Sequence, residues 1–330
     1  MKSISLLFVV LSTSVFGQYQ FSNPINLTGT DEGARTVHFS DDGTRVFGDW
    51  DQLTEWSIQS KSIVKSSEIV GYNTHKSAFD GQSIWMSSNV NYNTEKKDIT
   101  DTHSNINIID GKENTPNKTV NRYDIATFIP ETKDVIIAAI SKTNTYSVVR
   151  LSTETLEEST LYFDKNKDGV SVPAAIKVSD DGKYVAIGMA GETSGVRIYG
   201  VKEGNLVAFI PTTGDVNDLA FTQNGEFLFI GSGTLLVQLK TSDWTREKAW
   251  EFSSPISTLD VNSTGSYIAF SFQGAGAILV DTSDGAILAQ LSGGKVSDIT
   301  FSNDDKYIGL GVYKTLKSKE VPAIILYKKG

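Results

Sequence analysis

The stretch Ile176-Lys-Val-Ser-Asp-Asp-Gly-Lys-Tyr-Val-Ala-Ile187 places a turn rich in Asp and Gly between two apolar runs. Asp-Asp-Gly or Asn-Gly at such a point supplies the positive φ angles that a tight hairpin requires. The same phrase recurs along the chain, and a Phe or Val ends its first apolar run each time. The anchors are Phe39, Phe79, Phe128, Val178, Phe221, Val261 and Phe301.

Successive anchors are 40, 49, 50, 43, 40 and 40 residues apart. A period of about 40–50 residues with several short strands per unit is typical of a β-propeller. A third apolar segment and usually a fourth follow each hairpin, for example Val196–Tyr199 and Leu206–Ile210. We therefore expect an all-β, seven-bladed β-propeller of four-stranded antiparallel blades, with strands lettered a to d from the axis outward.

Two repeats fit the pattern less well than the others. The turn at Phe79-Asp-Gly81 is two residues shorter, and the Phe128 repeat has Pro130 and Thr132 but no Gly. Blades 2 and 3 are therefore the least regular of the predicted blades.

The last repeat lacks an outer strand, because only three residues follow Tyr327. A spare segment, Gln20–Leu27, precedes the first repeat. We expect this N-terminal strand to complete the last blade and close the ring, since closure removes exposed sheet edges. The two ends of the mature chain should then lie side by side.

The repeats resemble the WD-repeat and YVTN-type propeller families, the latter through Val178-Ser-Asp-Asp-Gly-Lys-Tyr-Val-Ala-Ile187. The resemblance spans almost the whole mature chain and concerns the fold. No blade has the Gly-His pair, and pairs such as Trp56-Ser57 or Val280-Asp281 replace Trp-Asp. The hydrogen-bonded tetrad of WD repeats is therefore not expected, and the fold alone implies little about function.

The N-terminus predicts export. Residues 1–17 combine the basic Lys2, an apolar core and small residues before Gln18, as a secretory signal peptide does. Residues 18–330 would then form a single seven-bladed domain with about 45 residues per blade. The chain has no Cys, which removes disulfides and an N-terminal lipidated Cys. We expect an exported bacterial protein that is periplasmic, outer-membrane-associated, displayed on the surface or secreted.

Charge argues against a nucleic-acid partner, and hydropathy argues against a transmembrane helix. The formal net charge is −9, and no Lys/Arg cluster is long enough to follow a phosphate backbone, so nucleic acid is not expected to bind. After the signal peptide no stretch reaches the roughly 18 apolar residues of a transmembrane helix. The protein is therefore expected to have no transmembrane segment of its own.

Long connections predict a binding face. In propellers of this type the b–c and d–a connections share one face, and the insertions Asn89–Ser104, Asp164–Pro173 and Lys314–Pro322 all map to it. Long loops on a rigid scaffold are where binding surfaces usually lie, although each loop taken singly is also consistent with a solvated connection. The candidate partner-binding residues are Trp50, Tyr92, Lys96, Lys97, His103, Tyr313 and Lys317.

A calcium loop is a weaker hypothesis. Asp164, Asn166 and Asp168, with Gly169, match the first half of an EF-hand loop, but Ala175 replaces the bidentate Glu at its twelfth position. An Asx-rich connection explains the same residues. Calcium is the one cofactor that the sequence suggests.

No catalytic set is apparent in the sequence. The three His residues have no matching carboxylate pattern for a catalytic zinc, and there is no nucleophile elbow or phosphate-cradling loop. Polar residues in the predicted inner strands, namely His38, Lys177, Asp218, Asp260 and Asp298, could line an axial channel. They could also satisfy one another and ordered water, as buried polar groups must.

These features predict a non-enzymatic interaction scaffold of the bacterial envelope. It would bind a protein partner through its b–c/d–a face, as an accessory subunit of an outer-membrane or secretion complex. The alternative is an enzymatic or ligand-binding propeller of the lactonase, lyase or carbohydrate-binding kind, using the axial polar residues or the aromatic face.

Overall fold

The computed structural model describes residues 20–31, 33–50, 52–68, 72–73, 78–81, 84–91, 103–110, 118–119, 123–140, 145–155, 157–165, 171–274, 276–291, 295–314 and 319–330. All regular elements among these residues are β-strands. The chain forms two compact units, one of Met1–Ser66 with Asn217–Gly330 and the other of Ser67–Val216. The predicted signal peptide lies outside the described residues.

The first unit contains four antiparallel sheets, each with the strand order of a propeller blade. Blade 1 consists of β2 (Thr36–Phe39), β3 (Arg45–Asp49), β4 (Gln52–Ser57) and β5 (Ser62–Glu68). Blade 5 consists of β19 (Val216–Phe221), β20 (Phe227–Ser232), β21 (Leu235–Lys240) and β22 (Arg246–Glu251). Blade 6 consists of β23 (Ile256–Val261), β24 (Tyr267–Phe272), β25 (Ala277–Asp281) and β26 (Ile287–Leu291). Blade 7 consists of β27 (Lys295–Phe301), β28 (Tyr307–Tyr313), β29 (Ile324–Lys328) and β1 (Ile25–Leu27).

The second unit contains three antiparallel sheets. Blade 2 consists of β6 (Tyr72–Asn73), β7 (Ala78–Phe79), β8 (Ile84–Asn91), β9 (His103–Asp110) and β10 (Lys118–Thr119). Blade 3 consists of β11 (Tyr123–Phe128), β12 (Asp134–Ile140), β13 (Thr145–Ser152) and β14 (Glu158–Lys165). Blade 4 consists of β15 (Val172–Val178), β16 (Tyr184–Ala190), β17 (Gly195–Gly200) and β18 (Leu206–Pro211).

The described residues therefore form seven antiparallel sheets, and the all-β propeller-blade fold predicted from the repeat is confirmed. Inner strands of successive blades pack together within each unit, as β23 does with β27 and β27 with β2. Blade 2 is irregular, as expected, because its inner strand is divided between β6 and β7, which both pair with β8.

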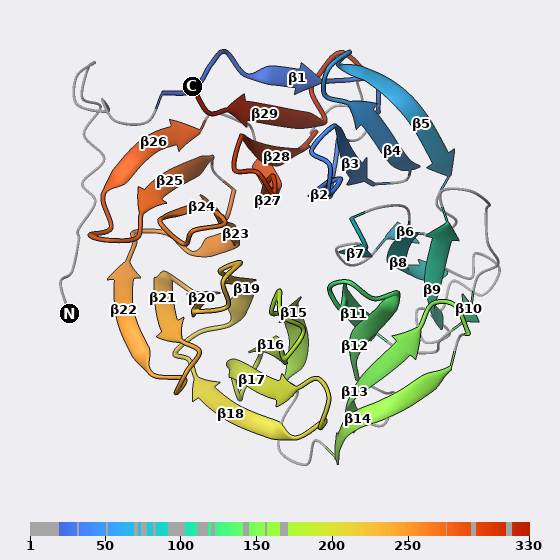
Figure 1. Ribbon diagram of the computed structural model, residues 1–330, viewed down its shortest axis with the longest axis vertical. Coiled ribbons are helices and arrows are strands. Elements are labelled where there is room, and N and C mark those ends of the chain that lie inside the picture. Colours follow the sequence, from blue (N-terminus) through green and yellow to red (C-terminus); the bar gives the residue numbers. More distant parts are fainter. Residues whose placement is uncertain are drawn as a thin grey trace. The chain divides into compact units, whose positions relative to one another are not determined.

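The N-terminal strand completes blade 7. In Figure 1, β1 lies alongside β29, and Ile25 pairs with Leu326 in the antiparallel ladder. The Gly330 amide donates to the Gln20 carbonyl oxygen over 2.9 Å. Leu27 is completely buried. The predicted outer strand of the last blade is confirmed, and Gln20 lies beside Gly330.

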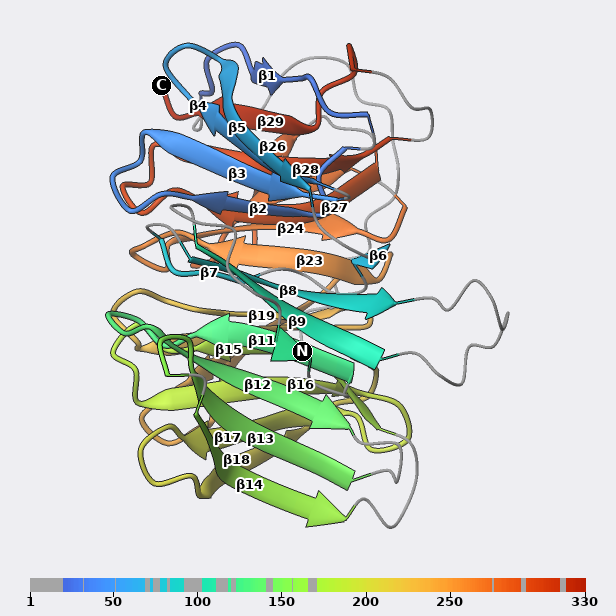
Figure 2. The same ribbon diagram turned by 90° about the vertical axis from the view of Figure 1, so that its right-hand side faces the viewer.

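A repeated hydrogen-bond motif holds the hairpin between strands a and b. In blade 4, Ser179 Oγ donates to Asp181 Oδ1 over 2.7 Å and accepts from the Tyr184 amide over 3.0 Å. The Gly182 amide donates to the Ser179 carbonyl oxygen, and Gly182 has φ +67°. The same motif begins at Ser40, Thr222, Asn262 and Ser302. Figure 2 shows the blade 1 hairpin joining β2 and β3.

Two hairpins keep the positive φ angle without Gly. In blade 7 the position of Gly182 belongs to Asp305, with φ +56°, whereas in blade 3 the positive φ lies one residue earlier, at Glu131 with φ +59°. In blade 3 Thr132 also takes over part of the side-chain motif, because its hydroxyl accepts from the Asp134 amide over 3.1 Å. The Phe128 repeat therefore forms a hairpin of the expected length despite its divergent sequence.

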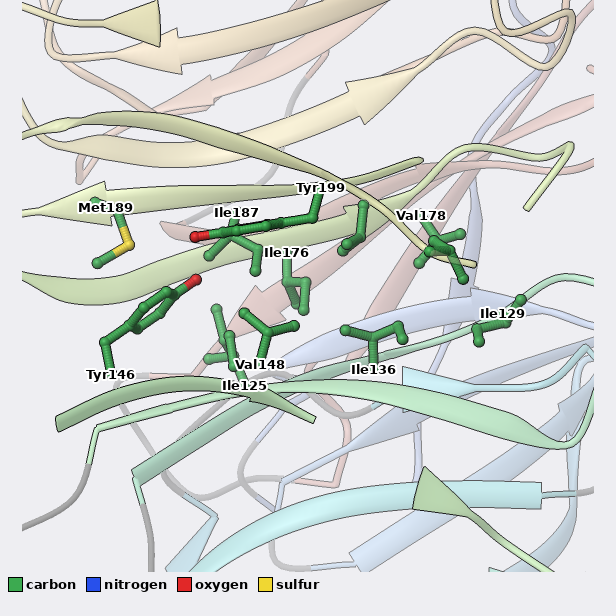
Figure 3. Close-up of a cluster of buried hydrophobic side chains, with 13 residues drawn as sticks. Ile125, Ile129, Ile136, Tyr146, Val148, Ile176, Val178, Ile187, Met189 and Tyr199 are labelled. Carbon is green, nitrogen blue, oxygen red and sulfur yellow. The ribbon is translucent and has the colours of Figure 1, made fainter. Parts of the chain in front are cut away.

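Apolar side chains fill the space between neighbouring blades. Figure 3 shows the cluster between blades 3 and 4, where residues such as Ile136, Val148 and Ile187 are buried. Tyr146 and Tyr199 direct their hydroxyls toward each other in this cluster. Burial raises the pKa of Tyr146 well above its ordinary value, so the ring stays neutral and contributes to the core.

Carboxylates of the inner strands join blades to one another. Asp218 Oδ2 in blade 5 accepts from the blade 6 amide of Leu259 over 3.1 Å. Asp298 Oδ2 in blade 7 accepts from the blade 1 amide of Val37 over 2.9 Å. The Thr258 hydroxyl lies 2.7 Å from Asp218 Oδ2 and 3.1 Å from Asp298 Oδ1, and donates its single hydrogen to one of them at a time. Because buried amides require acceptors, these polar residues hold the blades together.

The Asp298 carboxylate is expected to make a large contribution to stability. Asp298→Ala leaves the Val37 amide without this acceptor and should lower the free energy of unfolding by about 2–3 kcal/mol. Asp298→Asn, which keeps an acceptor oxygen, should lose less. Urea unfolding would measure both, with Asp284→Ala in an exposed turn as a control of equal charge change. Equal losses for Asp298→Ala and Asp284→Ala would contradict this role.

The hairpin motif predicts a loss of stability in acid. Hydrogen bonds from Ser40 and Thr44 lower the pKa of Asp42 to about 2, below its ordinary value near 4 in an unfolded chain. The charged form therefore stabilises the fold above about pH 4, and this contribution is lost as the pH falls toward 2. At the equivalent position in blade 5, Asn224 accepts the same hydrogen bonds. Thermal unfolding of Asp42→Asn should show a flatter loss between pH 4 and pH 2 than the native chain, and an unchanged slope would contradict the prediction.

Candidate functional site

A strap of residues 28–31 and 33–35 lies between β1 and β2, along one end of blade 7. The Gly29 amide donates to the Lys319 carbonyl oxygen over 3.0 Å, and the Ala34 amide donates to the Val312 carbonyl oxygen over 3.2 Å. Gly33 forms an isolated bridge with Tyr313. The strap thus attaches the first blade to the b–c connection of the last one.

Glycine is required at position 33 of the strap. Its φ is +101°, and a Cβ atom there would lie 2.1 Å from the Val312 carbonyl oxygen. No other residue fits both constraints. The close approach of the two backbones brings the start of blade 1 against Tyr313.

The buried side chain of Lys314 contacts the backbone of the strap. Its side chain is only 8% exposed, and its Nζ donates to the Thr30 carbonyl oxygen. Burial lowers the pKa of Lys314, while the charge of Asp31 acts in the opposite direction. Lys314 therefore stabilises the strap, because its ammonium donates to a backbone carbonyl oxygen.

Two aromatic rings and two cations gather beside the strap, and we call Arg35, Trp50, Tyr313 and Lys295 the cation–aromatic cluster. The Trp50 and Tyr313 rings meet edge to face, with centroids 5.1 Å apart and planes at 63°. The Arg35 guanidinium carbon lies 4.7 Å from the Trp50 ring centroid, and Lys295 Nζ lies 5.1 Å from the Tyr313 ring centroid. Both distances fall within the range of a cation–π interaction.

The cluster is accessible at its Tyr313 end. Tyr313 is 38% exposed, although large aromatic rings are usually buried. Lys295 is also exposed, whereas Trp50 and Arg35 are half-buried. The aromatic pair offers apolar contact and the two cations offer charge. The four side chains include neither a carboxylate nor an imidazole for proton transfer.

Sequence analysis found half of this cluster. It placed Trp50 and Tyr313 on the b–c/d–a face, and the structure brings them into contact. It missed Arg35 and Lys295, which lie just before strand a of blade 1 and at the start of strand a of blade 7. Arg35 belongs to the connection before β2, and Lys295 is the first residue of β27. Cations that border the d–a connections are therefore the sequence signal that could have identified both.

The other predicted site residues are not brought to this cluster by any described contact. Tyr92, Lys96, Lys97, Lys317, Asn166 and Asp168 lie outside the described residues. His103 begins β9, where it pairs with Asn91, so the blade 2 connection is shorter than expected. Asp164 was expected to begin a loop, but it lies in β14 and pairs with Tyr146.

The described residues show no other site of recognisable chemistry. Among them, no group of three or more His, Asp and Glu side chains could hold a metal ion. The inner-strand carboxylates Asp218 and Asp298 hold backbone amides of neighbouring blades. None of the described segments is a helix long and apolar enough to cross a lipid bilayer.

Comparison with protein-family models and with curated proteins gives no match to this chain. The repeated four-stranded antiparallel sheets are consistent with a propeller-like fold.

The Trp50–Tyr313 contact should be measurable as a coupling energy. Edge-to-face pairs contribute about 0.5–1.5 kcal/mol beyond their buried area. A double-mutant cycle of Trp50→Ala and Tyr313→Ala, followed by urea unfolding, should therefore show coupling of that size. A cycle of Trp50→Ala with Trp250→Ala, on the outer strand of blade 5, serves as the control and should be additive. Additivity in both cycles would contradict the contact.

Proposed function

We propose that this protein is a non-enzymatic interaction scaffold that binds a protein partner through the b–c/d–a end of blades 1 and 7. The cation–aromatic cluster carries this proposal. Interface centres are enriched in Trp, Tyr and Arg, and three of the four cluster residues belong to these types. The cluster is assembled from both ends of the chain, so it forms only when the blades are in place.

The inner strands support a binding role over an enzymatic one. A lactonase- or lyase-like site would use polar groups of the inner strands, and the described inner strands of the first unit contribute the carboxylates Asp218, Asp260 and Asp298. Each accepts at least one backbone amide of the next blade in the first unit, as Asp260 Oδ2 does from Phe301 over 2.7 Å. Carboxylates committed to the backbone in this way are poor candidates for proton transfer.

Carbohydrate binding has one observation in its favour, the exposed ring of Tyr313. Sugars stack on flat, open ring faces, however, and each ring of the cluster already has a cation near its face. A protein partner, which also meets ring edges and charges, suits this arrangement better.

The proposed place of action is the bacterial envelope. The N-terminal sequence resembles a signal peptide, and the absence of Cys agrees with a fold held without disulfides. On this proposal the protein is exported and acts as an accessory subunit of an outer-membrane or secretion complex.

Site-specific photo-crosslinking in the native cells would test the binding face. Tyr313, at the end of β28, is replaced by the photoreactive aromatic p-benzoylphenylalanine, and Lys306, in the turn directly before β28, is replaced in a control. We expect irradiation to join a discrete protein to position 313 and not to position 306. No crosslink at 313, or the same products from both positions, would refute the proposal.

A further inference from the structure

The hairpin between β19 and β20 in blade 5 carries the single Asn-Gly pair of the chain, Asn224-Gly225. Asn224 is exposed, and a Cβ atom at Gly225 would meet no described atom within 4 Å. Asn before Gly is the sequence most open to deamidation, because no side chain on the glycine shields its amide nitrogen. The tip of this hairpin therefore combines a reactive pair with room for a ring intermediate.

Equivalent hairpins place Asp where blade 5 has Asn224. Asn224 Oδ1 accepts from the Thr222 hydroxyl over 2.7 Å and from the Glu226 amide over 3.1 Å. An Asp carboxylate accepts from the same two positions in blades 1, 4 and 7, where the residues are Asp42, Asp181 and Asp304. A carboxylate at position 224 would therefore fit the hydrogen bonds of the native turn.

The side chain of Glu226 distinguishes blade 5 from the hairpins that carry Asp. Asn224 Nδ2 donates to Glu226 Oε2 over 3.2 Å. In blades 4 and 7 the residue equivalent to Glu226 is a lysine, and the ion pairs Lys183–Asp181 and Lys306–Asp304 form instead. Loss of the amide from Asn224 would therefore place two negative charges side by side in blade 5.

We propose that Asn224 is a site of spontaneous deamidation, and that the reaction changes its contact with Glu226 from a hydrogen bond to a repulsion. In the first step the Gly225 nitrogen bonds to Asn224 Cγ and loses its proton. The Cγ–Nδ2 bond breaks, and ammonia leaves with that proton. Water then opens the succinimide ring, and its addition at Cγ gives Asp, whereas its addition at the main-chain carbonyl carbon gives isoaspartate. Both products carry a carboxylate.

The hairpin affects this reaction in two opposite ways. Negative charge develops on Oδ1 as the nitrogen attacks Cγ, and the Thr222 hydroxyl and the Glu226 amide already donate to that oxygen. The Gly225 amide, however, donates to the Thr222 carbonyl oxygen over 2.8 Å, so this bond must open before the nitrogen can attack. Opening one hydrogen bond slows a reaction about fivefold, so deamidation should proceed without unfolding of the chain.

Incubation of the folded full-length chain in mildly alkaline buffer, followed by peptide mass spectrometry, would measure the conversion. We expect Asn224 to convert about fivefold more slowly than in a synthetic peptide of residues 220–228. Asn262, buried in the blade 6 hairpin, is the internal control and should keep its amide. Asn224→Gln should also keep its amide, because ring closure on Gln requires a larger ring. An intact Asn224 once the peptide has converted completely, or equal conversion of Asn262, would overturn the inference.

The change of charge is tested separately with Asn224→Asp, which has the Asp product from the start. Urea unfolding would measure its effect in the native chain and in Glu226→Lys, which restores the Asp–Lys arrangement of blades 4 and 7. The effect on the unfolding equilibrium constant should differ about fivefold between the two backgrounds, in favour of Glu226→Lys. Gln273→Glu adds the same charge at the opposite end of blade 6 and should act equally in both. Equal effects of Asn224→Asp in the two backgrounds would overturn the proposed repulsion.

Discussion

The β1–β29 ladder is the interaction on which the rest of the first unit depends. Without residues 25–27, the outer edge of β29 would expose unpaired backbone groups. Residues 25–27 fill that edge, and Leu27 is fully buried there. The Trp56 indole then donates to the Thr28 carbonyl oxygen over 3.0 Å, which ties blade 1 to the same segment. The strap and the cation–aromatic cluster follow from this pairing, because it carries the start of blade 1 across the end of blade 7.

Side chains at the two ends of the blades make different kinds of contact. At the hairpin end, a Ser, Thr or Asn side chain satisfies the turn, and nearby carboxylates neutralise the basic residues. Basic residues at that end therefore form ion pairs with carboxylates of their own blade. At the opposite end of blades 1 and 7, Arg35 lies over the Trp50 ring and Lys295 over the Tyr313 ring.

Much of the fold could be predicted because it rests on local chemistry. The period of the anchors, the positive φ angles of residues such as Gly182 and the spare strand before β2 each leave a direct trace in the sequence. Loop boundaries were predicted less accurately. Asp164 was expected to begin a loop, but it remains in β14 because the backbone of β13 continues to pair with it. Only half of the site could be predicted. Arg35 and Lys295 belong to it because of the aromatic rings that they contact, and those contacts join residues far apart in the sequence.

By itself, then, the sequence determined that this is an all-β chain of repeated blades whose last blade borrows a strand from the N-terminus. Turn geometry and strand alternation act over a few residues, so they can be read from the order of residues alone. Only the tertiary structure decided that Trp50 meets Tyr313, more than 260 positions later in the chain, and that both rings carry cations. The physical reason is that such contacts depend on how separate sheets pack against each other. The close approach of Gly33 to the Val312 carbonyl oxygen is part of that packing, and the order of residues along the chain does not reveal it.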